Sequence, residues 1–164
     1  MAITAPVIVA GAGPVGCTAA LRLAQAGVPV VLLEGLAALP ETLRASTFHP
    51  PTLDMLDELG MTQPLQAQGL VCPRYQYRDR RTDEIAEFDL GHLAADTRHP
   101  YRLQVEQWKY TRLVWQELQN RHANRAECHF NHAVKGVHQH NTGVDVLVWD
   151  HGQEKTLRGS YLIA

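Results

Sequence analysis

The stretch "GAGPVGCTAA" (residues 11–20) decides the fold of this chain. It places Gly11, Gly13 and Gly16 in the spacing G-x-G-x-x-G, with the small Ala20 four residues later. In a dinucleotide-binding loop the first glycine permits a tight turn, the second lets the backbone approach a pyrophosphate, and the third allows a helix to pack closely on a strand. The spacing carries this meaning only where a strand precedes it and a helix follows it.

The sequence on either side supplies that context. Three elements are predicted: a buried strand at "APVIVA" (5–10), a helix at "PVGCTAALRLAQA" (14–26) and a second buried strand at "VPVVLLE" (28–34). Gly27 is a typical stop for the helix. A strand, a helix and a strand in this order form a βαβ unit, whose strands are parallel and whose connection is right-handed.

A carboxylate completes the predicted ligand site. Glu34 ends the second strand roughly 20 residues after the glycines, which is the spacing at which an acidic side chain accepts hydrogen bonds from an adenosine ribose. Pro14 and Val15 begin the helix and are expected to contact the ligand, and the helix N-terminus offers free N–H groups and a partial positive charge to phosphates. These features predict an adenine dinucleotide, and the spacing alone leaves FAD and NAD open.

Three further elements are predicted in the middle of the chain. They are a short amphipathic helix at "PTLDMLDELG" (51–60), a hairpin at "YQYRDRRTDEIAEFDL" (75–90) and a longer helix at "QWKYTRLVWQELQN" (107–120).

The hydrophobic period changes to two from Glu127 onward. Turn signals at "NTG" and "HGQ" separate three β-rich arms, at 127–140, 144–150 and 156–163. We expect an antiparallel meander, and then a strand at "SYLIA" (160–164) that re-enters the parallel sheet and is buried on both faces. An NAD-dependent dehydrogenase would instead continue the βαβ series, so this pattern argues against one.

The composition indicates one folded domain. The chain has 164 residues, of which 45% are hydrophobic and 20% charged, and its net charge of −2 gives no reason to expect nucleic acid or an anionic membrane as a partner. The apolar start lacks a basic segment and is interrupted by Gly11, so no signal peptide or membrane span is predicted and the cytoplasm is the expected location. Cys17, Cys72 and Cys128 have no paired spacing and are expected to be reduced thiols.

Several side chains are assigned to structure rather than to chemistry. Four histidines lie close together in sequence, namely His129, His132, His138 and His140. No cysteine or carboxylate completes a persuasive ligand set with them, so no metal site is predicted. Trp108 and Trp115 lie one heptad apart on the long helix and are expected in the core, and Cys17 is expected to pack.

Two stretches together resemble a known family. "VIVAGAGPVGCTAALRLAQAGVPVVLLEG" (7–35) followed by "LRASTFHPPTLDMLDELG" (43–60) is similar to the N-terminal part of the FAD-dependent aromatic hydroxylases, the group of para-hydroxybenzoate hydroxylase and 3-(3-hydroxyphenyl)propionate hydroxylase. The resemblance covers the whole chain. It implies FAD and a glutathione-reductase-type, Rossmann-like α/β fold with a parallel sheet and a β-meander. Residues 1–164 would then be the N-terminal part of an FAD-binding domain, incomplete at the C-terminus, with 71–100 a candidate first segment of a substrate domain.

The resemblance also implies three further cofactor-binding positions. Arg44 corresponds to the family's arginine along the FAD, and its guanidinium can fork onto phosphate or ribose oxygens. The family has a glutamine at the start of the helix after the hairpin, and Gln107 fits that register better than Gln104, although Thr111 stands where the family often has Glu. Val134 matches the position whose backbone faces the adenine.

The resemblance implies an NADH- or NADPH-dependent flavoprotein monooxygenase that hydroxylates a phenolic substrate with O₂, and no catalytic side chain in this portion. The alternatives are a ubiquinone-pathway hydroxylase, a halogenase or an isoprenoid reductase of the same fold, or a non-catalytic FAD-binding fragment. The family's later G-x-D-G and G-D-A segments, which hold the flavin end, are not among these residues. The chain alone is therefore expected to be inactive and to hold FAD weakly. Its aromatic substrate, its nicotinamide donor and its oligomeric state stay open.

Overall fold

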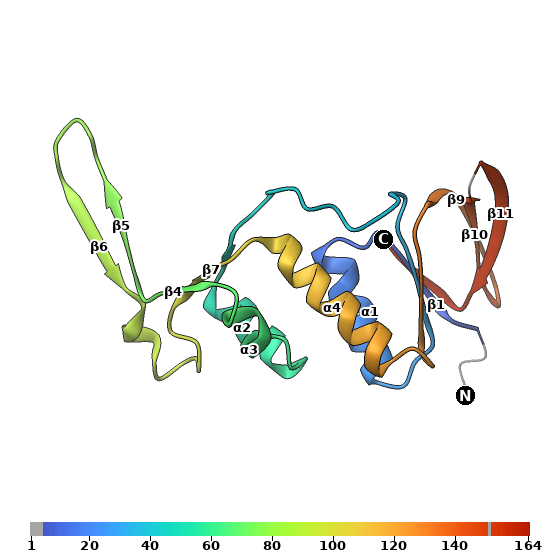
Figure 1. Ribbon diagram of the computed structural model, residues 1–164, viewed down its shortest axis with the longest axis horizontal. Helices are drawn as coiled ribbons and strands as arrows, with labels where there is room; N and C mark the ends of the chain where they lie inside the picture. The colour runs from blue at the N-terminus through green and yellow to red at the C-terminus, as the bar shows by residue number, and fades with distance from the viewer. Residues whose placement is uncertain (1–4, 151) are drawn as a thin grey trace. The chain divides into compact units, whose positions relative to one another are not determined.

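The computed structural model describes residues 5–150 and 152–164 of the chain (Figure 1). These residues form two compact units. The first comprises Met1–Thr42 and Thr111–Ala164, as far as they are described, and the second comprises Leu43–Tyr110. The boundary falls within helix α4 (Gln107–Arg121). None of the helices in the described ranges combines the length and the hydropathy that crossing a bilayer requires.

The first unit is built on a parallel sheet with the strand order β12-β1-β2-β8. Its strands are β1 (Val7–Ala10), β2 (Val30–Leu33), β8 (Ala126–His129) and β12 (Tyr161–Ile163), and helix α1 (Pro14–Gln25) connects β1 to β2. Val7 of β1 lies opposite Val30 of β2 and Tyr161 of β12. The predicted βαβ start with parallel strands is confirmed, and so is the mixed α/β fold class.

Small side chains let α1 lie close to this sheet. Its buried residues are Cys17, Ala20, Leu21 and Ala24. Pro14 stands in the first turn, where its missing N–H removes no helical hydrogen bond. The helix stops before Gly27, whose φ of +77° lies in the left-handed region that glycine adopts without steric penalty.

An antiparallel meander packs on the face of the parallel sheet opposite α1. Its strands are β9 (His132–His140), β10 (Gly143–Asp150) and β11 (Gln153–Gly159), in the order β11-β10-β9. Alternate residues of β10 are buried against Ile8 and Leu33 of the parallel sheet, namely Val144, Val146 and Val148. The first unit therefore has three layers, of which Figure 1 shows the meander at the red end of the chain.

Two of the three predicted β arms are divided between sheets. The arm at 127–140 is broken at Asn131, which has φ +59°, so β8 joins the parallel sheet and β9 the meander. The arm at 156–163 is broken at Ser160, whose N–H donates to the Pro6 carbonyl at 2.8 Å. Predicting the arm at 127–140 as one continuous strand was wrong, because a period of two runs unchanged through a turn that transfers the chain to another sheet.

The strand predicted at 160–164 does return to the parallel sheet, as β12, but it is not buried on both faces. Leu162 packs on the core shared with the meander, whereas Tyr161 is 69% exposed and Ile163 37% exposed. Within the described residues β12 pairs only with β1, and successive side chains of a strand point to opposite faces. One face of β12 is covered by the meander, and the other is open.

The second unit contains the predicted short helix and hairpin and a small sheet that the sequence did not reveal. Its elements are β3 (Thr47–Phe48), α2 (Pro50–Glu58), α3 (Thr62–Gln66), β4 (Leu70–Cys72), β5 (Arg74–Arg78), β6 (Ile85–Asp89), the 3₁₀ helix η1 (Leu90–Leu93) and β7 (Arg102–Gln104). The small sheet has the order β3-β7-β4. Strands of two or three residues are too short to show a hydrophobic period.

Asp54 of α2 holds the segment that follows the hairpin. Thr97 Oγ1 donates to Asp54 Oδ2 at 2.7 Å, and His99 Nδ1 lies 2.7 Å from Asp54 Oδ1. The hydrogen bonds from Thr97 and His99 hold the pKa of Asp54 below its ordinary value. The ionised carboxylate therefore stabilises this unit.

We predict that Asp54→Asn lowers the thermal unfolding midpoint at neutral pH by roughly 2–4 °C. Because the folded-state pKa of Asp54 is lowered, its stabilisation is present above the ordinary carboxyl pKa of about 3.9 and is lost as the pH falls through the lower folded value. The difference from wild type should shrink below about pH 4 in thermal unfolding followed by circular dichroism. Asp57→Asn is the control, since its partner Arg98 is exposed and such pairs contribute little. A difference that stays constant with pH contradicts this role.

Candidate functional site

The three glycines at the junction of β1 and α1 have different steric surroundings. Gly11 has φ +97°, in the left-handed region, and its N–H donates to the Leu33 carbonyl at 2.7 Å. A Cβ on Gly16 would overlap the Gly11 carbonyl oxygen, so the close approach of α1 to the end of β1 requires a residue without a side chain. A Cβ on Gly13 would meet no atom within 4 Å, so this glycine keeps space open beside the loop.

The N-terminus of α1 faces that space with unpaired amide groups. Gly13 is the N-cap residue and supplies no side-chain cap, and the first intrahelical bond runs from the Cys17 N–H to the Gly13 carbonyl at 2.9 Å. The amides of Val15 and Gly16 therefore have no acceptor within the helix. Val15 is 80% exposed. With the helix dipole, this geometry suits a phosphate group.

A hollow of about 260 Å³ lies against the loop. Its lining includes Gly11, Gly13, Val15 and Gly16, together with Ile163 of β12. The absence of a side chain at Gly13 and the uncapped helix end both fit a pyrophosphate lying across the glycines.

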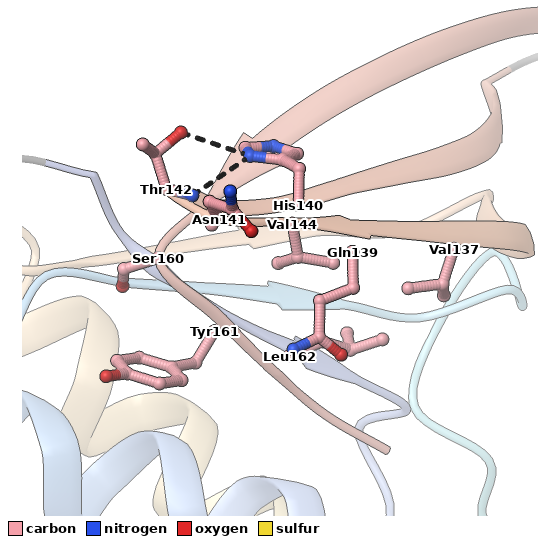
Figure 2. Close-up of a pocket in the computed structure, with 10 residues that line it drawn as sticks. Val137, Gln139, His140, Asn141, Thr142, Val144, Ser160, Tyr161 and Leu162 are labelled. Carbon is pink, nitrogen blue, oxygen red and sulfur yellow. Dashed lines mark hydrogen bonds between the residues drawn. The ribbon is translucent and has the colours of Figure 1, made fainter.

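A larger hollow of about 660 Å³ lies elsewhere in the first unit, between the β9–β10 turn and β12 (Figure 2). Figure 2 shows His140 at its rim, where Nδ1 accepts a hydrogen bond from the Thr142 N–H at 3.3 Å. No helix N-terminus and no carboxylate line this hollow. The smaller hollow at the glycine loop is therefore the candidate site, because only it has the chemistry to bind a dinucleotide.

The Glu34 carboxylate is held by two backbone amides, one of which belongs to the glycine loop. Its Oε2 accepts a hydrogen bond from the Ala12 N–H at 3.0 Å, and its Oε1 accepts one from the Leu36 N–H at 3.0 Å. An ionised carboxylate has about four acceptor positions, so capacity for two ribose hydroxyls remains. The side chain is half-buried, and its orientation is already set by the backbone.

The structure also brings the start of β9 to Glu34. The Glu34 N–H donates to the His129 carbonyl at 2.8 Å, and the His132 N–H donates to the Glu34 carbonyl at 2.9 Å. Val134, two residues further along β9, is half-buried against the core shared by the sheet and the meander. The glycine loop, Glu34 and Val134 thus belong to one region of the first unit.

Arg44 and Gln107 lie in the second unit. Arg44 is exposed, and the Gln107 N–H donates to the carbonyl of Ala45, the next residue along from Arg44, at 3.0 Å. The pairing of β3 with β7 explains this proximity.

Gln104, the alternative to Gln107, already has partners for both ends of its amide. Its Nε2 donates to Ser46 Oγ at 3.0 Å, and its Oε1 accepts from Thr47 Oγ1 at 3.2 Å. Its side chain therefore has a structural role in the β3–β7 region, which favours Gln107 as the glutamine that meets a ligand.

The side chains assigned to structure follow the predictions in part. Cys17 is buried, and burial raises the pKa of its thiol to about 12, with smaller contributions from Cys128 and Glu34. Such a thiol packs and does not act as a nucleophile.

Trp108 and Trp115 are only half-buried, so placing them in the core was wrong. An indole is rarely buried completely, because of its size.

The histidines do not gather into a metal site in the described ranges. No group of three or more His, Cys, Asp or Glu side chains there is arranged to hold an ion. His129 and His132 have ring centroids 4.9 Å apart, and the carboxylate near His132 is that of Asp150. The sequence analysis did not predict that the backbone of this histidine pair contacts Glu34. The available signal was the asparagine between them, Asn131, because asparagine tolerates the left-handed conformation found there.

A family model described as "FAD binding domain" matches residues 4–164. The para-nitrophenol 4-monooxygenase of Pseudomonas sp. strain WBC-3 is 34% identical over 158 residues, which cover 96% of this chain and 39% of that protein. The 6-hydroxy-3-succinoylpyridine 3-monooxygenase of Pseudomonas putida is 36% identical over 118 residues, covering 72% of this chain and 30% of that protein. The chain therefore spans well under half of the curated relatives it matches.

A solved structure shows the same fold. The crystal structure of p-nitrophenol 4-monooxygenase from Pseudomonas putida matches with a TM-score of 0.89 and 31% identity, over 96% of this chain and 40% of that one. A flavin-dependent monooxygenase solved with FAD and substrate matches with a TM-score of 0.83 at 23% identity, a likeness of fold alone. The predicted resemblance to FAD-dependent aromatic hydroxylases is confirmed.

Gly16→Ala should destabilise the protein, whereas Gly13→Ala should leave its stability almost unchanged. The added Cβ at Gly16 overlaps the Gly11 carbonyl, so we expect α1 to be displaced and the thermal unfolding midpoint to fall by roughly 4–12 °C. The Cβ at Gly13 meets open space, so that variant should unfold within about 2 °C of wild type. Equal midpoints for the two variants in calorimetry would contradict the packing role of Gly16.

Proposed function

Because the chain belongs to the family of FAD-binding domains, we propose that it is the FAD-binding part of an NAD(P)H-dependent monooxygenase that hydroxylates a phenolic aromatic compound. The observation that carries the cofactor assignment is the Glu34 carboxylate, held by the Ala12 N–H beside an uncapped helix N-terminus. The relatives' names support the substrate class, since one acts on para-nitrophenol and the other on a hydroxypyridine.

The first unit supplies the proposed contacts to the adenosine diphosphate half of FAD. The pyrophosphate lies across the glycine loop and the first turn of α1, formed by Gly11, Gly13, Pro14, Val15 and Gly16. Glu34 accepts hydrogen bonds from the ribose hydroxyls, and the Val134 backbone faces the adenine. Each group is set by backbone geometry, so little ordering is left to occur on binding.

The second unit supplies the remaining proposed contacts. Arg44, whose side chain is exposed, is the proposed partner of phosphate or ribose oxygens of FAD, and Gln107, at the start of α4, is the proposed amide contact to the cofactor. Residues 71–100 form the proposed first segment of a substrate domain. The hairpin β5–β6 supports this assignment: its apolar side chains Tyr77, Ile85 and Phe88 are exposed, as in a strand pair that needs further covering.

When bound, FAD supplies the redox chemistry, with NADH or NADPH as reductant and O₂ as oxidant. The residues of this chain bind and orient the cofactor, and no catalytic side chain is proposed among them. Cys17, Cys72 and Cys128 are free thiols, which supports the cytoplasm as the proposed location.

Glu34→Gln should weaken cofactor binding without unfolding the protein. An amide places an N–H toward a backbone donor and removes a charge-assisted acceptor, so we expect the FAD Kd to rise about 10- to 100-fold in a flavin fluorescence titration. Glu127→Gln is the matched control, since Glu127 is exposed on β8 of the same sheet. Wild-type affinity in Glu34→Gln, or no FAD binding by the wild-type protein, would overturn the assignment of this site.

The activity is tested with the complete gene product loaded with FAD. 4-Nitrophenol or another phenol should accelerate oxidation of NADH or NADPH, with a hydroxylated product detected by chromatography and mass spectrometry. A panel of phenols and hydroxypyridines that gives neither acceleration nor product would contradict the proposed reaction while leaving FAD binding intact.

A further inference from the structure

His132 closes a turn beside the proposed ribose site. It is the first residue of β9 and is only 8% exposed. Its Nδ1 lies 2.8 Å from the Phe130 carbonyl oxygen, and because a carbonyl only accepts, Nδ1 carries the proton and donates. Its Nε2 lies 3.5 Å from Asp150 Oδ2, at the end of β10. Both ring nitrogens therefore face oxygen acceptors, which a hydrophobic side chain of similar size could not satisfy.

The turn at 129–132 forms hydrogen bonds with both the backbone N–H and the backbone carbonyl of Glu34. The His129 carbonyl accepts from the Glu34 N–H at 2.8 Å, and the His132 N–H donates to the Glu34 carbonyl at 2.9 Å. The Asn131 N–H donates to the Leu36 carbonyl at 2.9 Å. These bonds fix the backbone on which the Glu34 carboxylate stands.

The turn needs a restraint because its backbone is unusual. Asn131 has φ +59°, a left-handed conformation that asparagine tolerates but that surrounding contacts must hold. Ala133 immediately follows the turn, and a Cβ on Gly35 would come 3.4 Å from the Ala133 Cβ. The start of β9 therefore also lies close to the residue after Glu34. A relaxed turn would shift Glu34 relative to the Ala12 amide.

We propose that His132 is a positioning residue for Glu34: it holds the turn that orients the carboxylate toward the adenosine ribose, without touching the cofactor itself. This inference rests on the proposed function of Glu34. It goes beyond packing, because it predicts that the effect of His132 on ligand affinity passes through the Glu34 side chain.

The test is a double-mutant cycle with ADP as the ligand, measured by calorimetric titration. His132→Leu should raise the ADP Kd about five- to tenfold in the wild-type background and less than about twofold in the Glu34→Gln background. His132→Asn, whose amide can still donate to the Phe130 carbonyl, should stay within about twofold of wild type. Equal weakening in both backgrounds, or none in the wild-type background, would overturn the proposal.

His138→Leu is the matched control, because His138 is exposed on the same strand. It should leave the ADP Kd unchanged. If it weakens ADP binding as much as His132→Leu does, the effect belongs to β9 in general and the proposal fails.

Amide hydrogen exchange of the ligand-free protein separates this inference from the proposed function. His132→Leu should reduce protection of the Glu34 amide about tenfold, and leave Val31 in the middle of β2 unchanged. A wild-type protein that binds neither FAD nor ADP refutes the proposed function, whereas unchanged protection at Glu34 refutes the role of His132.

Discussion

The close approach of α1 to the end of β1 is the contact on which the rest of the structure depends. A side chain at Gly16 would overlap the Gly11 carbonyl, so the helix can start where it does only because position 16 carries no Cβ. This packing places the uncapped first turn of α1 next to a left-handed Gly11 and leaves the space beside Gly13 open. The proposed anion site is therefore a consequence of close packing, since orphan amides and a helix dipole come with any such helix start.

Glu34 connects this loop to the other layers of the first unit. Its carboxylate is bound by the amide of Ala12, its backbone N–H and carbonyl are bound by His129 and His132, and it directly follows β2, an inner strand of the sheet. A single residue thus joins the glycine loop, the parallel sheet and the start of the meander. Such a position suits a ligand-binding carboxylate, because its orientation is set before the ligand arrives.

Much of the fold was readable from local pattern. The glycine spacing with its two flanking apolar runs predicted β1, α1 and β2, and Leu spacing with a terminal Gly60 predicted α2. The β arms were readable as strands, and so was the return of residues 160–164 to the parallel sheet, but the division of the arm at 127–140 between two sheets was not. Asn131 and Ser160 transfer the chain from one sheet to another without interrupting the alternation of side chains.

The candidate site divides in the same way. The sequence by itself determined the residue types of the glycine loop and Glu34, because turn geometry, close packing and the proposed ribose recognition each restrict what can stand at those positions. Only the tertiary structure decided that the His129–His132 turn holds Glu34, that Gln104 is engaged by Ser46 and Thr47, and that one face of β12 is open. These outcomes depend on contacts between segments distant in the chain, and local hydrophobic periodicity does not show which segments meet.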